Sequence, residues 1–254
     1  MANALVQQAH NQARDVERAI REFFDQVNDV LSWVPDALGH LVRPIEQGMA
    51  AVARAVRDFW DRVNRLWDQP GDADRLRATG ERWTAGVGRV VDDIADTIEP
   101  HRLRTDVEWA GRAARAYQKT VLPQSQGLKD VKDLSDQVRT SLTNLANSVD
   151  AFWMAIGFAF GGFLVAMAIA IAEACSVVGI PAAIATVLTA VGAAVGLLGT
   201  AVLAMEAHFN SIEAEQLAIR QKAEDIDSTW QRPNTADLAD ATVRDGDRPD
   251  WEPA

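Results

Sequence analysis

The sequence predicts an all-α protein built from helical hairpins, with long helices and a two-helix hairpin of the transmembrane type. Apolar residues recur in steps of three and four along most of the chain, which is the period of an amphipathic helix. Proline and glycine separate these stretches at helix-length intervals. Between Ala151 and Met205 the only charged residue is Glu173. No segment shows the apolar–polar alternation that predicts a β-strand.

The segment 1–68 predicts a pair of amphipathic helices. The first apolar stripe consists of Ala13, Val16, Ile20, Phe23, Val27 and Val30, and the second of Leu38, Leu41, Ile45, Val52, Val56, Phe59, Val63 and Leu66. Pro35 ends the first helix, because proline has no N–H to donate within a helix. Pro44 is tolerated in a first turn, so we expect the second helix to begin near it. The short linker predicts antiparallel pairing.

The segment 69–150 predicts a second helical hairpin. A loop at 69–72 precedes a third helix with apolar residues from Leu76 to Ile98, which ends before Pro100. We expect a fourth helix to begin at Thr105 or Asp106, either of which can cap it, and to be interrupted at Pro123. A fifth apolar pattern, 128–149, then continues without a break signal into the uncharged stretch.

A tryptophan–glycine motif lies about 39 residues after the loop at 69–72. Pro70-Gly71-Asp72 opens the third helix, and Trp109-Ala110-Gly111 is followed by Ala113, Ala114 and Ala116. Over residues 69–150 this combination resembles the WXG family of helical-hairpin proteins associated with type VII (ESX) secretion, here as a longer member. The resemblance implies that Trp109 and Gly111 lie at a turn between helices, with Trp109 packed against the third helix.

The sequence departs from that family in its export signal. The family often carries a Tyr-x-x-x-acid signal, but the only tyrosine is Tyr117 and Val121 stands four residues after it. The resemblance therefore implies a link to type VII secretion, as a substrate, effector or accessory component, without establishing export.

The segment 151–205 predicts an apolar membrane hairpin. As a helix, 151–172 is about 33 Å long, enough for a hydrocarbon core of about 30 Å. A tip at 173–180, with Glu173 and Gly179, leads to a second helix that Pro181 opens and whose apolar run lasts to Met205. Trp153 is a candidate interfacial anchor. The helix-packing candidates are Gly157 and Gly161 in the first helix and Gly192 and Gly196 in the second, at the spacing that lets helices approach closely in lipid.

The two N-terminal stripes leave two arrangements open. If they bury against each other, the hairpin is uncovered and must sit in lipid, since its apolar patch exceeds what water tolerates. If they bury against the hairpin, the protein is a soluble bundle that stores the hairpin, as in a pore-forming toxin. A third interpretation is a membrane-anchored coiled-coil scaffold. The leading hypothesis is a membrane-associated protein that acts through helix pairing and insertion.

Composition limits the remaining possibilities. The net charge of −11 argues against nucleic-acid binding. The four histidines are scattered and no catalytic or cofactor motif occurs, so we expect no enzyme activity, cofactor, metal or small-molecule substrate.

The expected partners are a lipid bilayer and a helical protein or a second copy. Basic residues flank the outer hairpin ends, which favours cytoplasmic termini, with secretion as the alternative. Segment 206–230 predicts an amphipathic helical extension, and 231–254 a disordered acidic tail.

Overall fold

The computed structural model describes residues 4–35, 39–68, 70–104, 109–110, 112–229 and 252–253. Its helices are α1 (Ala4–Ser32), α2 (Gly39–Trp67), α3 (Ala73–Trp83), α4 (Arg89–Thr97), α5 (Pro100–Leu103), α6 (Arg112–Glu173) and α7 (Ile180–Thr229). The described strands are β1 (Trp109–Ala110) and β2 (Glu252–Pro253), which pair antiparallel with Trp109 opposite Pro253. The all-α prediction is confirmed.

The chain divides into two compact units, each built from separate stretches of sequence. The hairpin unit contains Met1–Asp74 and Ala146–Phe209, and the second unit contains Arg75–Leu145 and Asn210–Ala254. Helices α6 and α7 contribute to both units, because each runs without a break from amphipathic into apolar sequence. The predicted continuity of 128–149 with the apolar stretch is therefore confirmed.

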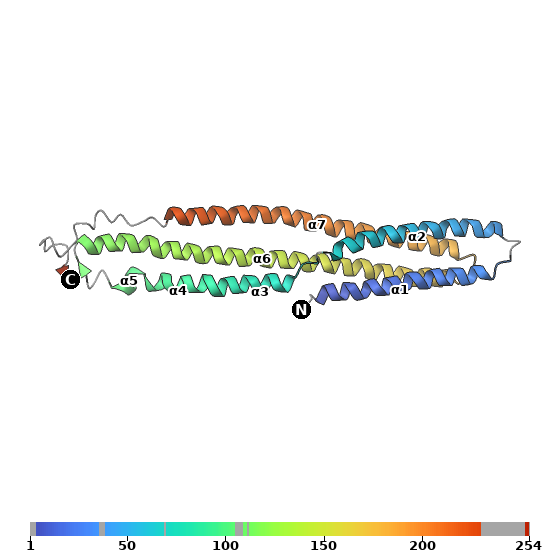
Figure 1. Cartoon of the computed structure of the whole chain (residues 1–254), viewed down its shortest axis with the longest axis horizontal. Helices are drawn as coiled ribbons and strands as arrows, with labels where there is room; N and C mark the ends of the chain where they lie inside the picture. The colour runs from blue at the N-terminus through green and yellow to red at the C-terminus, as the bar shows by residue number, and fades with distance from the viewer. Residues whose placement is uncertain are drawn as a thin grey trace. The chain divides into compact units, whose positions relative to one another are not determined.

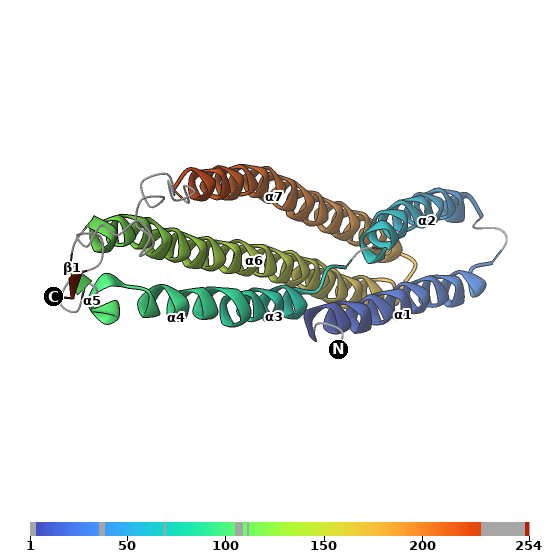
Figure 2. The ribbon, with the colours of Figure 1, turned by 60° about the vertical axis from the view of Figure 1, so that its left-hand side comes forward.

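Four helical segments form the hairpin unit: α1, α2, the second half of α6 and the first half of α7 (Figures 1 and 2). Each buries one stripe with heptad-like spacing, as expected for helices packed nearly parallel. On α6 the stripe consists of Val149, Trp153, Ile156, Phe160, Phe163, Met167 and Ala170. Because α6 ends at Glu173 and α7 begins at Ile180, the predicted antiparallel hairpin with its tip at 173–180 is confirmed.

Three predictions about helix boundaries are wrong, two of them made from proline and one from a helix cap. Helix α2 begins at Gly39, so Pro44 lies inside it. Helix α6 begins at Arg112 instead of Thr105 or Asp106, and it passes through Pro123 without interruption. A proline within a helix removes one backbone hydrogen bond. Packing along the rest of these long helices outweighs that local loss, which is why the breaks predicted from local preference do not form.

The predicted third helix contains a π-helical segment, Thr84–Gly88, between α3 and α4. The residues of this helix that are fully buried are Ala73, Gly80, Gly88 and Ala95. Their spacing is regular except for one extra residue between Gly80 and Gly88, which the wider π-helical turn accommodates. At this segment the buried Ser135 hydroxyl of α6 donates to the Trp83 carbonyl over 3.3 Å. The extra residue in the π-helical turn thus keeps these four small residues on one face of the helix.

Polar contacts complete the packing of the α4–α5 region on α6 in the second unit. The Ser125 hydroxyl donates to the Ala95 carbonyl over 3.2 Å. The Lys129 ammonium hydrogen-bonds the Glu99 carboxylate. That hydrogen bond, reinforced by the attraction between the two opposite charges, lowers the pKa of Glu99 and raises the pKa of Lys129 from their ordinary values.

Replacing Glu99 with Gln tests this ion pair. The folded pKa of Glu99 lies below its ordinary value of 4.5, so the stabilisation is complete above that value and is lost as the pH falls through the folded pKa. We expect wild type to melt at a higher temperature than Glu99→Gln near neutral pH, and the difference to vanish in strong acid. Circular dichroism melts measure this, with Asp93→Asn as control. A difference that persists in acid would exclude the pair as its cause.

Candidate functional site: a partly covered apolar hairpin

The apolar stripes of α1 and α2 bury against the hairpin. Phe59 of α2 is fully buried, stacks on Phe163 with ring centroids 5.6 Å apart, and meets Phe160 edge-on at 6.1 Å. On α1, the Gln12 Oε1 atom lies 3.2 Å from the position that a Cβ on Gly157 would occupy. Of the two arrangements that the sequence left open, the structure shows the covered one.

The inner faces of the four helices therefore form one core. The α1 and α2 residues in it are Val6, Ala9, Ala13, Val16, Ile20, Phe23, Val27, Ile45, Val52, Val56, Phe59 and Val63. The α7 residues are Ile180, Ala183, Ile184, Val187, Ala190, Val191, Ala194, Leu198 and Ala201. Burying each large aliphatic or aromatic side chain contributes about 1.5–3 kcal/mol. Helices α1 and α2 thus pack against the hairpin through an extensive apolar interface.

A tryptophan pair fixes the end of α2 to α6. The Trp153 Nε1–H donates to the Pro70 carbonyl over 2.7 Å, and its ring stacks on Trp67 with centroids 4.9 Å apart. Gly71 has φ of 71°, and a Cβ there would lie 3.2 Å from the Val149 side chain, so the connection needs glycine. Trp153, the predicted interfacial anchor, is only 1% exposed here.

Trp67 was not singled out by the sequence analysis, although a signal was present. It follows Phe59 and Val63 at steps of four, so it continues the second stripe by one further turn. Its ring also meets His10 of α1 edge-on at 3.8 Å. Trp67 therefore lies between α1 and α6 at the end of the covered region.

The hairpin tip is a tight connection. Glu173 is the last residue of α6, and its Oε2 accepts a hydrogen bond of 2.8 Å from the Thr186 hydroxyl of α7. A Cβ on Gly179 would lie 2.0 Å from the Glu173 carbonyl oxygen, so only glycine fits. Pro181 is the second residue of α7, where its missing N–H costs nothing. The structure thus brings Glu173, Gly179 and Pro181 together.

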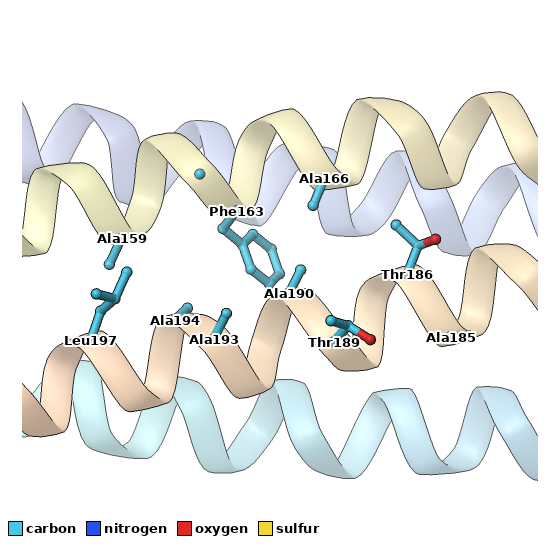
Figure 3. Close-up of a pocket in the computed structure, with 11 residues that line it drawn as sticks. Ala159, Phe163, Ala166, Ala185, Thr186, Thr189, Ala190, Ala193, Ala194 and Leu197 are labelled. Atoms are coloured by element: carbon cyan, nitrogen blue, oxygen red, sulfur yellow. The ribbon is translucent and has the colours of Figure 1, made fainter.

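The four helix-packing glycines do not hold the hairpin together in this structure. Gly157 faces Gln12 of α1, while a Cβ on Gly161, Gly192 or Gly196 would meet no neighbouring atom within 4 Å. Instead, α6 and α7 border an apolar groove of about 480 Å³, shown in Figure 3. Alanines from both helices and the Phe163 ring line it. The role of these glycines in lipid stays a prediction.

The surface of the hairpin that α1 and α2 do not cover is apolar. Its exposed large side chains are Met154, Phe158, Val165, Ile169, Leu197 and Leu203. Both α6 and α7 are long and apolar enough to cross a membrane, and only 33% and 28% of their most apolar windows are buried. The core helix of a soluble protein would be mostly buried. The hairpin is therefore covered on one side only.

The described part of the tryptophan–glycine motif, Trp109–Ala110, lies between helices. Trp109 is in β1, after α5 and before α6, and residues 76–120 do not form one unbroken helix. The predicted position of Trp109 between helices, rather than within one, is confirmed. The Trp109 side chain and Gly111 lie outside the described residues, as does most of the tail 231–254. The packing of Trp109 on the third helix stays a prediction.

The described residues contain no group of three His, Cys, Asp or Glu side chains that could hold a metal ion. Cys175 lies at the tip as an exposed free thiol. Comparison of the chain with protein-family models, curated proteins and solved structures finds no match.

Replacing Trp153 with Phe tests the connection between α2 and α6. Phe keeps a ring against Trp67 but leaves the Pro70 carbonyl without its donor. We expect a loss of about 1 kcal/mol in the free energy of unfolding, the usual net worth of one hydrogen bond, and faster proteolysis at residues 68–72. Urea unfolding measures the first quantity. Trp60→Phe is the control, because Trp60 makes ring contacts with Phe59 and Phe160 but has no described hydrogen bond; equal losses would refute the assignment.

Proposed function

We propose that this chain is a non-catalytic membrane-inserting protein that stores an apolar hairpin against α1 and α2 and delivers it to a lipid bilayer. The observation that carries the proposal is the one-sided cover. Amphipathic helices bury the inner stripe of the hairpin, while its outer surface is apolar enough for lipid. This arrangement is the one expected of a pore-forming toxin that keeps an apolar hairpin folded against amphipathic helices.

The stored arrangement cannot itself lie in a bilayer, because α1 and α2 carry charges along their outer faces. These exposed residues are Arg14, Glu17, Arg18, Arg21, Glu22 and Asp25 on α1, and Arg54, Arg57, Asp58, Asp61, Arg62 and Arg65 on α2. On insertion scales, each charge at the bilayer centre costs about 2.5–3.5 kcal/mol. Insertion of the hairpin therefore requires α1 and α2 to separate from it and stay in water.

The hairpin loses little when it exchanges these helices for lipid. Its backbone groups are already paired within α6 and α7, which is the condition for crossing hydrocarbon. Acyl chains can cover both the inner stripe and the outer surface, whereas α1 and α2 cover only the former. Glu173, the one charge from Ala151 to Met205, lies at the tip, where it reaches the far side of the bilayer if the hairpin spans it.

The link to type VII secretion is a second proposal, supported by the motif residues and their placement. Pro70-Gly71-Asp72 precedes α3, and Trp109 lies between α5 and α6. A gene for this chain beside genes of a secretion machine would support the link. Loss of the protein from the cell envelope and medium when that machine is deleted would test it directly.

A disulfide that locks α2 onto α7 tests the proposed release. A Cβ on Gly48 would lie 2.8 and 3.2 Å from Ile184 side-chain atoms, so Gly48→Cys with Ile184→Cys places two thiols within bonding range. Cys175→Ser removes the native thiol. We expect the oxidised protein to leave phosphatidylcholine vesicles intact, and the reduced protein to release trapped dye and to protect the hairpin from protease.

The reduced form of the same variant controls for the two substitutions. Phe59→Glu has the opposite effect to the disulfide, because it weakens the packing of α2 on the hairpin. A carboxylate cannot be buried beside Phe160 and Phe163 without a large cost in free energy. We expect this variant to insert faster than wild type, or to aggregate when no vesicles are present. Equal insertion by the oxidised and reduced forms would show that release of α2 is not required, and no insertion by any form would defeat the proposed function.

A further inference from the structure

Helix α1 buries large side chains mainly in its C-terminal part. The buried residues of that part are Val16, Ile20, Phe23 and Val27, and those of residues 4–13 are Val6, Ala9 and Ala13. Hydrophobic stabilisation is proportional to the apolar surface removed from water, and an alanine removes much less than an isoleucine or a phenylalanine. Residues 4–13 are therefore held to the rest of the hairpin unit more weakly than the C-terminal part of α1.

Helix α6 has glycines beside this weakly buried part of α1. A pocket of about 270 Å³ lies between the two helices, and its lining includes Leu5, Gln8 and Gln12 of α1 and Gly157, Gly161 and Gly162 of α6. A Cβ on Gly161 or Gly162 would meet no neighbouring atom within 4 Å, so α1 does not close down onto α6 at these positions. A gap of this kind removes dispersion contacts from the interface.

A polar atom is buried in the same contact. The Gln12 Oε1 atom lies 3.2 Å from the position that a Cβ on Gly157 would occupy, and among the described residues it finds no hydrogen-bond donor. Burying an acceptor without its donor costs free energy that the surrounding packing must offset. When α1 moves away from α6, water can donate to this oxygen. Opening of the contact therefore recovers part of that cost.

Helix α2 has no comparable weak part among its described residues. Its buried side chains include Ile45, Val52, Val56, Phe59 and Val63, all of which are large. The hydrogen bond from Trp153 to the Pro70 carbonyl fixes the connection that follows its last turn. Near the other end, a Cβ on Gly48 would lie 2.8 Å from an Ile184 side-chain atom, so α2 is in close contact with α7 there.

We propose that residues 4–13 of α1 separate from α6 while α2 stays packed on the hairpin, and that this local opening is the first step of release. Folded proteins open locally where few apolar contacts hold a segment. In residues 4–13 weak burial, the pocket and the unpartnered Gln12 oxygen coincide. The opening is a property of the folded chain in water, and only its place in release rests on the proposed function.

Hydrogen exchange of the full chain in detergent-free buffer tests the opening. After correction for intrinsic rates, we expect the amides of residues 9–13 to exchange about tenfold faster than those of residues 23–27. The two segments lie equally far from opposite ends of α1, so fraying of the helix ends alone gives similar rates. Similar rates would therefore overturn the inference.

The variant in which a disulfide locks α2 onto α7 tests the order of opening. In oxidised Gly48→Cys, Ile184→Cys, Cys175→Ser protein we expect residues 9–13 to exchange as fast as in the reduced form, because α1 is not locked. Exchange that slows with oxidation would show that α1 and α2 open together, and would overturn the proposed order.

Gln12→Leu tests the cause of the opening and its place in release. Leucine removes the buried acceptor and adds apolar contact at the pocket, so we expect exchange at residues 9–13 to slow about tenfold. Dye release from phosphatidylcholine vesicles should slow as well. Gln7→Leu is the matched control, because it makes the same change at an exposed position of α1, and we expect neither rate to fall.

The two readouts separate this inference from the proposed function. Unchanged exchange in Gln12→Leu, or slower exchange with unchanged dye release, would overturn the inference while leaving insertion itself intact. A wild type that exchanges rapidly at residues 9–13 but never enters vesicles would defeat the proposed function and support the local opening.

Discussion

The aromatic contact between α2 and α6 is the interaction on which the covered arrangement of the hairpin depends. Phe59 stacks on Phe163 and meets Phe160, and all three side chains are fully or almost fully buried. Without α2 in this position, the Phe160 and Phe163 rings would lose the contact with Phe59 that helps to bury them. The same contact keeps the charged side of α2 pointing to water. Burial of the inner stripe and exposure of the charged faces of α1 and α2 thus follow from the same packing.

Two patterns coexist on α6 and α7, and they favour different surroundings. The heptad-like inner stripe, with Trp153, Phe160 and Met167, matches amphipathic neighbours. Within 151–205 the remaining circumference exposes Phe158 and Val165, and its exposed polar residues include Thr189 and Thr200, but it carries no charge except Glu173 near the tip. A helix selected only for a soluble bundle would carry charge on that side, as α1 and α2 do. A helix selected only for lipid would not need a stripe that matches α1 and α2.

The sequence predicted the elements whose signal is long and repetitive. Uncharged length and heptad spacing located the hairpin, its tip at Glu173 and Gly179, and the N-terminal pair. Features decided by distant contacts were not predictable. The helix passes through Pro123 because packing outweighs one lost hydrogen bond. The π-helical segment at Thr84–Gly88 exists because the small residues on either side must reach the same face of α6. The Trp153–Pro70 bond joins residues that no local pattern connects.

The continuity of α6 and α7 bears on how a stored hairpin could leave its cover. Neither helix breaks where amphipathic sequence gives way to apolar sequence near Ala146 or beyond Met205. The hairpin is therefore already folded, and its tip is already closed by Gly179. Its transfer to lipid requires loss of side-chain packing with α1 and α2 but no new backbone hydrogen bonds. Because the interface lost is apolar and lipid is apolar too, the main cost of release is exposure of the stripes on α1 and α2. Those stripes can still pair with each other, which is the other arrangement that the sequence allows.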